Sequence, residues 1–280
     1  TATEKAQVLA FMESVAGLNR AGGLSGIAID TANDVSIGTW DFTTKTLTPT
    51  LIRPTAVTVI ARRDGNQNGP ITTFFANVMG IPTLNVSATA TAALGPLGFV
   101  PPGTANFPVG ISKRWFDEGH DCGDSIKFHP TGTLDGCAGW HTFTTAPSNA
   151  NRLRTILSDL KDGSYVSPAI TAGQTQLEFT GGTVASVFDE MKALYDANKD
   201  PATGTWDVKI PVYDSDDCGN PGGAITIVGF ATATVTEVLE VPEKQIIAKV
   251  TCDKILDGRP GGTMVNGGMS PLSTIPALVS

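Results

Sequence analysis

The chain has 280 residues, enough to bury a substantial core as one large domain or two moderate ones. Only 16% of the residues are charged, while glycine and proline number 31 and 18, a profile more typical of extracellular β-rich proteins than of cytosolic enzymes. The net charge of −8, with no run of lysine or arginine, opposes binding to nucleic acid or to an anionic bilayer surface.

The first element expected is a helix over residues 1–19, because apolar side chains recur there at helical spacing before Gly22 and Gly23. These side chains are Ala2, Ala6, Leu9, Met12, Val15 and Ala16. We favour an ordinary amphipathic helix. The alternative is the exposed end of a longer hydrophobic helix that anchors or polymerises the protein. No apolar run in the sequence is long enough to span a bilayer and no signal peptide is evident, so we expect a soluble, already processed chain.

Residues 55–94 are the central feature of the sequence and predict a strand, a short helix and a second strand. Residues 55–62 alternate and are rich in β-branched side chains. An apolar stripe of helical period follows and ends at Gly80; it consists of Ile71, Phe74, Phe75, Val78 and Met79. The pattern then returns to period two, with alanine at positions 88, 90 and 92. A right-handed crossover is the expected connection, and the small alanines predict an element packed closely on their face.

Short strands are expected at residues 26–30 and 35–40, before the central segment. Residues 95–108 contain too much glycine and proline for a regular element and are interpreted as a linker or a crossing segment at the domain boundary. Residues 115–140 predict a loop-rich excursion that carries two of the cysteines.

The rest of the chain predicts two helices, at residues 151–161, capped by Ser148 or Asn149, and at residues 183–197. Strands are expected at residues 109–113, 177–179, 206–212, 224–230, 231–239 and 245–251, the last two forming a hairpin. The end of the chain is too glycine-rich to fold alone, so it must lie on the body, pair with a neighbouring copy or stay mobile.

The predicted fold class is α+β, with mixed or antiparallel sheets, a few short helices, an N-terminal helix and a glycine-rich C-terminal tail. Three parts are expected. Residues 1–100 hold the N-terminal helix and the strand-helix-strand segment, residues 101–255 form a disulfide-containing α+β domain, and residues 256–280 form an extended tail.

Several short motifs resemble the TadE/TadG-like proteins of tight-adherence (Flp) pilus assembly. They are VTVIARR and FFANVMGIPTLNVSATATAAL in residues 55–94, Gly38-x-Trp40-Asp41 before them, and GGAITIVGFATATVTEVLE and the final IPALVS after them. The resemblance implies that a strand, a phenylalanine-rich helix and an alanine-rich strand follow an N-terminal membrane helix. A membrane segment or leader would then have been removed or would precede Thr1. Other copies of the chain or components of the pilus and cell envelope are the implied partners.

Four cysteines without a C-x-x-C motif predict disulfides in an oxidising, extracellular or cell-surface compartment. Three connectivities are open, and we favour Cys122 with Cys137 and Cys218 with Cys252. Zinc is the alternative for the first cysteine-bearing stretch, through His120, Cys122, His129, Cys137 and His141. Their spacing matches no standard zinc finger, so a loop-closing disulfide is preferred.

Calcium is the better metal candidate. Asp196, Asn198, Asp200 and Asp207 fall at positions 1, 3, 5 and 12 of an EF-hand-like count, which is the alternation that wraps a loop around a hard cation. Pro201 stands where the usual glycine would make the sharp turn. Two further acidic groups, residues 64–69 and 214–217, are weaker candidates, and polar turns explain all three equally simply.

No nucleophile elbow, phosphate-binding loop, dinucleotide fingerprint or zinc-protease motif occurs, so a non-enzymatic protein is expected. The preferred function is a structural or assembly component of a pilus-like appendage, either an accessory or a self-polymerising subunit. The alternative is a secreted adhesin or binding module with calcium-stabilised loops. In the first hypothesis either terminus adds a strand to a neighbour's sheet.

Overall fold

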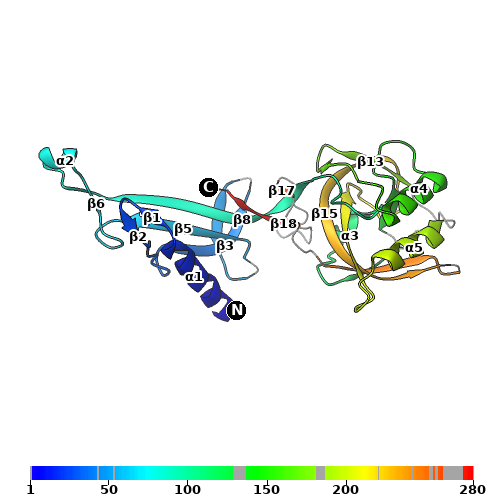
Figure 1. Ribbon diagram of the computed structural model, residues 1–280, viewed down its shortest axis with the longest axis horizontal. Coiled ribbons are helices and arrows are strands. Elements are labelled where there is room, and N and C mark those ends of the chain that lie inside the picture. The colour runs from blue at the N-terminus through cyan, green and yellow to red at the C-terminus, as the bar shows by residue number, and fades with distance from the viewer. Residues whose placement is uncertain are drawn as a thin grey trace. The chain divides into compact units, whose positions relative to one another are not determined.

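The computed structural model describes residues 2–42, 44–52, 54–128, 137–180, 187–219, 221–240, 242–251, 255, 258–260 and 274–279 (Figure 1). The chain divides into two compact units, one formed by Thr1–Leu94 with Pro276–Ser280 and the other by Gly95–Ile275. Short helices and mixed or antiparallel sheets make up both, so the predicted α+β class is confirmed.

An antiparallel sheet is the centre of the first unit. Its strands run in the order β4, β3, β5, β8. Their bounds are β3 (Val35–Asp41), β4 (Thr46–Pro49), β5 (Ala56–Arg63) and β8 (Val86–Val100). Gly38 is required where β3 meets β4, because a Cβ there would lie 2.1 Å from the carbonyl oxygen of Thr48. Trp40 packs with Ala56 and Ala93 in the small core of this unit. Both named residues of the motif Gly38-x-Trp40 therefore have a structural role.

The N-terminal helix α1 (Ala2–Gly17) confirms the first predicted element. Leu9, Met12 and Ala16, at i, i+3 and i+7, are its half-buried positions among the residues whose burial is described. The short hairpin β1 (Arg20–Ala21) and β2 (Leu24–Ser25) follows it. Residues 26–30 were expected to be a strand and are not one, although Ile27 and Ile29 are buried there.

The predicted right-handed crossover is wrong, because β5 and β8 pair antiparallel over their whole shared length, from Ala56 opposite Ala93 to Arg63 opposite Val86. The connection between them holds only the two-stranded ladder of β6 (Ile71–Thr72) and β7 (Thr83–Leu84), with the four-residue helix α2 (Phe75–Val78) at its end. A crossover needs a helix long enough to pack back on the sheet. The predicted close packing on the alanine face is also wrong, because Ala88, Ala90 and Ala92 are exposed.

The chain enters the second unit within β8, so residues 95–100 are a strand and not the irregular segment expected there. Residues 95–100 continue the strand and pair with β12 (Ile170–Thr171) and β17 (Arg259–Pro260). Leu97 and Val100 are buried there, and that burial outweighs the local preference of glycine and proline for loops. The described end of the tail, β18 (Thr274–Leu278), also pairs with β8. The tail of this chain therefore lies on its own body at these residues.

A ring of five strands organises the second unit. The ladder runs β15, β13, β11, β9, β14 and closes because β14 pairs again with β15, while β16 and β10 extend it from β15. The strands are β9 (Val109–Ser112), β10 (Ser125–Phe128), β11 (Ala138–His141), β13 (Gln176–Thr180), β14 (Trp206–Tyr213), β15 (Gly222–Leu239) and β16 (Gln245–Val250). One long strand, β15, covers the two strands expected at residues 224–239 and changes partners along its length.

Three helices accompany this ring: α3 (Lys113–Asp117), α4 (Ala150–Lys161) and α5 (Phe188–Asn198). The side chain of Asn149 accepts a hydrogen bond from the backbone N–H of Arg152 at 3.1 Å, which confirms one of the two predicted caps of α4. Leu153 and Leu157 of α4 and Met191 and Leu194 of α5 are fully buried in the main core. The apolar faces of both helices are therefore as the helical periodicity predicted.

The predicted disulfide pairing is wrong, because Cys137 is bonded to Cys218. The pair links the residue before β11 to the loop between β14 and β15, 81 positions apart in sequence. Neighbours in sequence were favoured for their short loops, but the closed ring of strands brings these distant segments together. Cys122 is also in a disulfide, and Cys252 lies outside the described residues.

Candidate interaction site of the first unit

An exposed apolar cluster stands at the end of the connection between β5 and β8, and we call it the apolar tip. It consists of Phe74, Phe75, Val78, Met79 and Ile81. Val78 is 88% exposed and the two phenylalanines are 84% and 82% exposed. Figure 1 shows α2 at the far end of the β6 and β7 ladder, away from α1. Four of the tip residues, Phe74, Phe75, Val78 and Met79, belong to the helical stripe that the sequence predicted, but they face solvent.

The tip is a tight reversal. The rings of Phe74 and Phe75 pack edge to face with their centroids 5.1 Å apart. The backbone N–H of Thr73 donates to the carbonyl of Pro82, and that of Ile81 donates to Ala76, which closes the turn around α2. Residues 65–112 carry no charged side chain, so the tip has no charge of its own. Exposed apolar side chains grouped in this way mark interaction sites.

Arg63 holds Gly69 and Pro70, where the segment that leads to the tip begins, and we call this place the base of the tip. Its guanidinium donates to four carbonyl oxygens, at distances of 2.7 to 3.3 Å, those of Ala21, Gly22, Gly69 and Pro70. Gly22 has a φ of +52°, and a Cβ there would meet Arg63 Nη1 at 2.8 Å, so this close approach requires glycine. The arginine thereby joins the β1–β2 hairpin to the base of the tip.

Replacing Arg63 with methionine should lower the free energy of unfolding of the first unit by about 2 kcal/mol, because four carbonyls lose a charged donor. Arg63→Lys is the matched control, since it keeps the charge but cannot form the planar fork, and an intermediate loss is expected. Urea unfolding gives the stability. Faster amide exchange at Thr73 and Ile81 would report the loosened tip, and unchanged exchange in Arg63→Met would contradict this role.

A polar turn at residues 64–69 lies beside this arginine. Asp64 accepts hydrogen bonds from the backbone N–H groups of Asn66 and Gln67, which lower the pKa of its carboxyl. The amide of Asn68 bonds to both the N–H and the carbonyl of Ala28 and to the carbonyl of Arg62. The turn therefore holds the loop after α1 against the end of β5, and these contacts account for its polar side chains without a metal.

An open apolar groove of about 400 Å³ lies between α1 and β5, and we call it the α1 groove. Its lining includes Phe11, Met12, Val15, Ile29, Val59 and Ala61. Arg20 is the one charged side chain among the residues that line it. Phe11 is 71% exposed, and Val8, Phe11 and Val15 form an exposed stripe along the helix at i, i+3 and i+7. Leu18 is exposed directly after the end of the helix.

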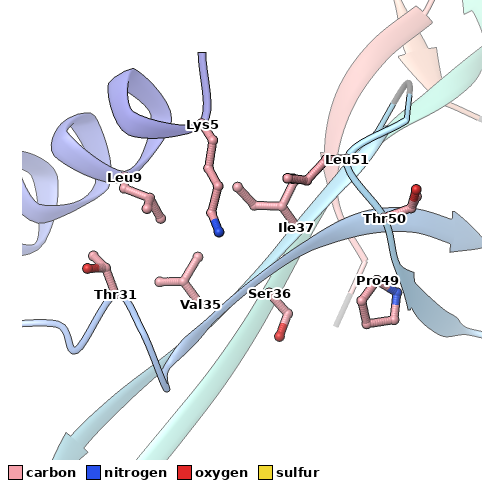
Figure 2. Close-up of a pocket in the computed structure, with 9 residues that line it drawn as sticks. All are labelled: Lys5, Leu9, Thr31, Val35, Ser36, Ile37, Pro49, Thr50 and Leu51. Carbon is pink, nitrogen blue, oxygen red and sulfur yellow. The ribbon is translucent and has the colours of Figure 1, made fainter. Parts of the chain in front are cut away.

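A second cavity, of about 350 Å³, lies on the same unit between the start of α1 and β3 (Figure 2). Figure 2 shows the Lys5 side chain reaching from the helix toward Val35 and Ile37, with Thr31 and Leu51 at the sides. The lining residues include no acid and no nucleophile beyond serine and threonine hydroxyls. The cavity therefore offers one cation and apolar walls, and no combination of acid, base and nucleophile.

The four residues predicted to bind calcium serve other contacts. Asp196 pairs with Lys192 and Lys199, whose ammonium groups lower the pKa of its carboxyl. Asp200 accepts from the backbone N–H groups of Ala202 and Thr203. The side chain of Asn198 donates to the carbonyl of Leu194, and Asp207 accepts from the hydroxyl of Thr234 at 2.7 Å. Within the described part of the chain these carboxylates do not converge on one point. The calcium loop stays a prediction.

A calorimetric titration decides this prediction. Because the carboxylates already bond to lysines, backbone N–H groups and a hydroxyl, added calcium should release no heat. It should also leave the melting temperature unchanged, since only a ligand that binds the folded state raises the melting temperature. A saturable heat that disappears in Asp200→Asn would instead establish the loop.

The histidines and cysteines considered for zinc are also separated by their contacts. His141 is fully buried, where it accepts a hydrogen bond from the N–H of Phe143, and burial lowers its pKa to about 3. His120 stacks on Trp115 with ring centroids 4.6 Å apart. Cys137 is in its disulfide, and His129 lies outside the described residues.

The first unit thus presents two apolar surfaces on a small sheet, and these features define an interaction or assembly module. Residues 1–92 match the family model described as "Putative Tad-like Flp pilus-assembly". The resemblance to Tad-related proteins seen in the sequence is therefore confirmed for this segment. No curated protein and no solved structure gives a significant match. Within the described residues, no helix has the length and apolar character needed to cross a membrane.

The match to this family model supports a role in pilus assembly, and a location at the cell surface or envelope agrees with it. The disulfide between Cys137 and Cys218 is compatible with an oxidising compartment. The sequence motifs pointed to the family, but they did not reveal that the phenylalanine-rich segment faces solvent. The one available signal was the uncharged run of residues 65–112, which leaves that segment without a charged face.

Proposed function

We propose that this protein is a non-catalytic component of a Tad-type pilus, outside the cytoplasm, that acts by binding other copies of itself or other parts of the pilus machinery. The observation that carries the proposal is the apolar tip, in a segment that matches a pilus-assembly family. Five large apolar side chains in solvent cost stability and solubility unless a partner covers them. An accessory and a self-polymerising subunit both satisfy this requirement.

The test is made in the organism that encodes the chain. Deleting the gene should abolish or strongly reduce surface pili counted by electron microscopy, and the intact gene should restore them. A copy carrying Phe74→Ser and Phe75→Ser should not restore them, although the protein is exported in normal amount. The matched control is Ile52→Ser, which changes an 81% exposed side chain of the same unit outside the tip.

Normal piliation in the deletion strain would reject the assembly function. Negative-stain microscopy of the purified protein then separates the two forms of the proposal, because a subunit forms filaments alone and an accessory does not. A glycan array examines the adhesin alternative, for which binding that survives the tip substitutions would be the supporting result.

A further inference from the structure

We propose that the apolar tip of one copy inserts into the α1 groove of a second copy, forming a head-to-tail contact. The two surfaces lie on the same unit but are different patches, so the contact is heterologous. Such contacts continue into rings or open filaments, whereas a self-complementary patch stops at a dimer. This deepens the assembly function proposed above and rests on it for its biological purpose.

The chemistry of the two surfaces matches. The tip carries no charged side chain, and the groove is lined by apolar residues of α1 and β5 with Arg20 as its one charged residue. Neither surface therefore loses strong charge hydration when they meet, apart from a single guanidinium whose long stem can keep its charge in water. A polar partner would leave Phe74 and Phe75 without suitable contacts.

The arrangement within the unit directs the contact to another copy. Arg63 and the turn at residues 64–69 hold the base of the tip, and Figure 1 shows the tip extending beyond the β1–β2 hairpin, away from α1. The tip is therefore kept out of the groove of its own chain. A second copy presents the same groove at a place that the tip can reach.

The size of the contact predicts its strength. Two phenyl rings bury about 150–250 Å² each, so with the matching loss in the groove the contact buries about 600–1,000 Å² in total. Interfaces of that size are weak and transient when isolated. We therefore expect reversible, concentration-dependent association, which becomes persistent when many copies are held together. Copies that carry a net charge of −8 repel one another, so added salt should strengthen the association.

The test uses two variants of the full chain in sedimentation velocity. The tip variant carries Phe74→Ser and Phe75→Ser. The groove variant carries Phe11→Ser and Val15→Glu, at positions exposed enough to leave folding intact. Each alone should self-associate at least about 30-fold more weakly than the unchanged protein, the loss expected for a central interface residue. Ile52→Ser and Val166→Ser, exposed apolar positions outside both surfaces, should associate normally.

Mixing the two variants is the decisive step. The tip variant keeps an intact groove and the groove variant keeps an intact tip, so the mixture should form a one-to-one dimer and nothing larger. A mixture that stays monomeric, a tip variant that associates like the unchanged protein, or an unchanged protein that is monomeric at every concentration would overturn the proposal. A vesicle test gives one further contradicting outcome. If the unchanged protein floats with neutral phosphatidylcholine vesicles and the tip variant does not, the tip is a bilayer anchor and the proposal is overturned. These outcomes reject the contact between tip and groove. Normal piliation in the deletion strain is a different result, which rejects the assembly function itself.

Discussion

Replacing Cys137 and Cys218 together with alanine should lower the free energy of unfolding of the second unit by about 4.5 kcal/mol. The bond closes a loop of 81 positions, and in the chain-entropy model a cross-link of that span restricts the unfolded chain by this amount. The expected loss is a large fraction of the 5–15 kcal/mol or so that typical domains possess. Urea unfolding followed by tryptophan fluorescence measures it, because Trp115, Trp140 and Trp206 all lie in this unit.

The matched control for this experiment is the serine pair at the same positions. Cys137 is fully buried, so a serine hydroxyl there adds a desolvation cost that alanine does not. The difference between the two pairs isolates that cost, while the loss shared by both reports the cross-link. A shared loss below about 1 kcal/mol would show that the hydrogen bonds nearby already hold the loop, namely those from Ser112 to Cys137 and to Asp217.

Acid should destabilise the second unit through His141. Burial lowers the pKa of this side chain from 6.5 to about 3 in the folded state. The unfolded chain therefore takes up the proton first, and stability is lost as the pH falls below about 6.5, at about 1.4 kcal/mol per pH unit until the folded pKa is reached. Between pH 7 and pH 4.5 this amounts to about 2.5 kcal/mol. The contribution is fully present only above the unfolded pKa.

The comparison that isolates this effect is His141→Asn, which retains an acceptor for the N–H of Phe143 and does not titrate. The variant is expected to be less stable at neutral pH, because it leaves a gap beside Phe143 and Phe179. Its urea midpoint should nevertheless fall less steeply with acid. Equal slopes in the variant and the unchanged protein would contradict the assignment to His141.

Local patterns were sufficient where one short segment decides the outcome. The helical stripe of residues 151–161 predicts α4, with Asn149 as one of two candidate caps, and the alternation of residues 55–62 predicts β5. The hairpin between β15 and β16 likewise follows from its turn residues. Each of these depends on contacts within a few residues, which a single sequence displays directly.

Long-range pairing could not be predicted in the same way. The bond between Cys137 and Cys218 depends on the closure of the ring by β14 and β15, which no local spacing encodes. The EF-hand-like count at residues 196–207 runs from α5, which continues to Asn198, to β14, which begins at Trp206, and calcium binding there stays a prediction. Spacing identifies possible ligands, and only the backbone path decides whether they converge.

By itself, the sequence determined the α+β class, the likeness to a Tad-related family and most helices and strands. Periodicity and short motifs depend only on residues that are close together in the chain, so a single sequence contains them. Only the tertiary structure decided that Phe74, Phe75, Val78 and Met79 face solvent. A helical stripe predicts that apolar side chains share one face of a helix. Whether that face is buried depends on which element packs against it. Here β8 returns antiparallel beside β5, so the sheet never lies beneath the stripe and the apolar face is left for a partner.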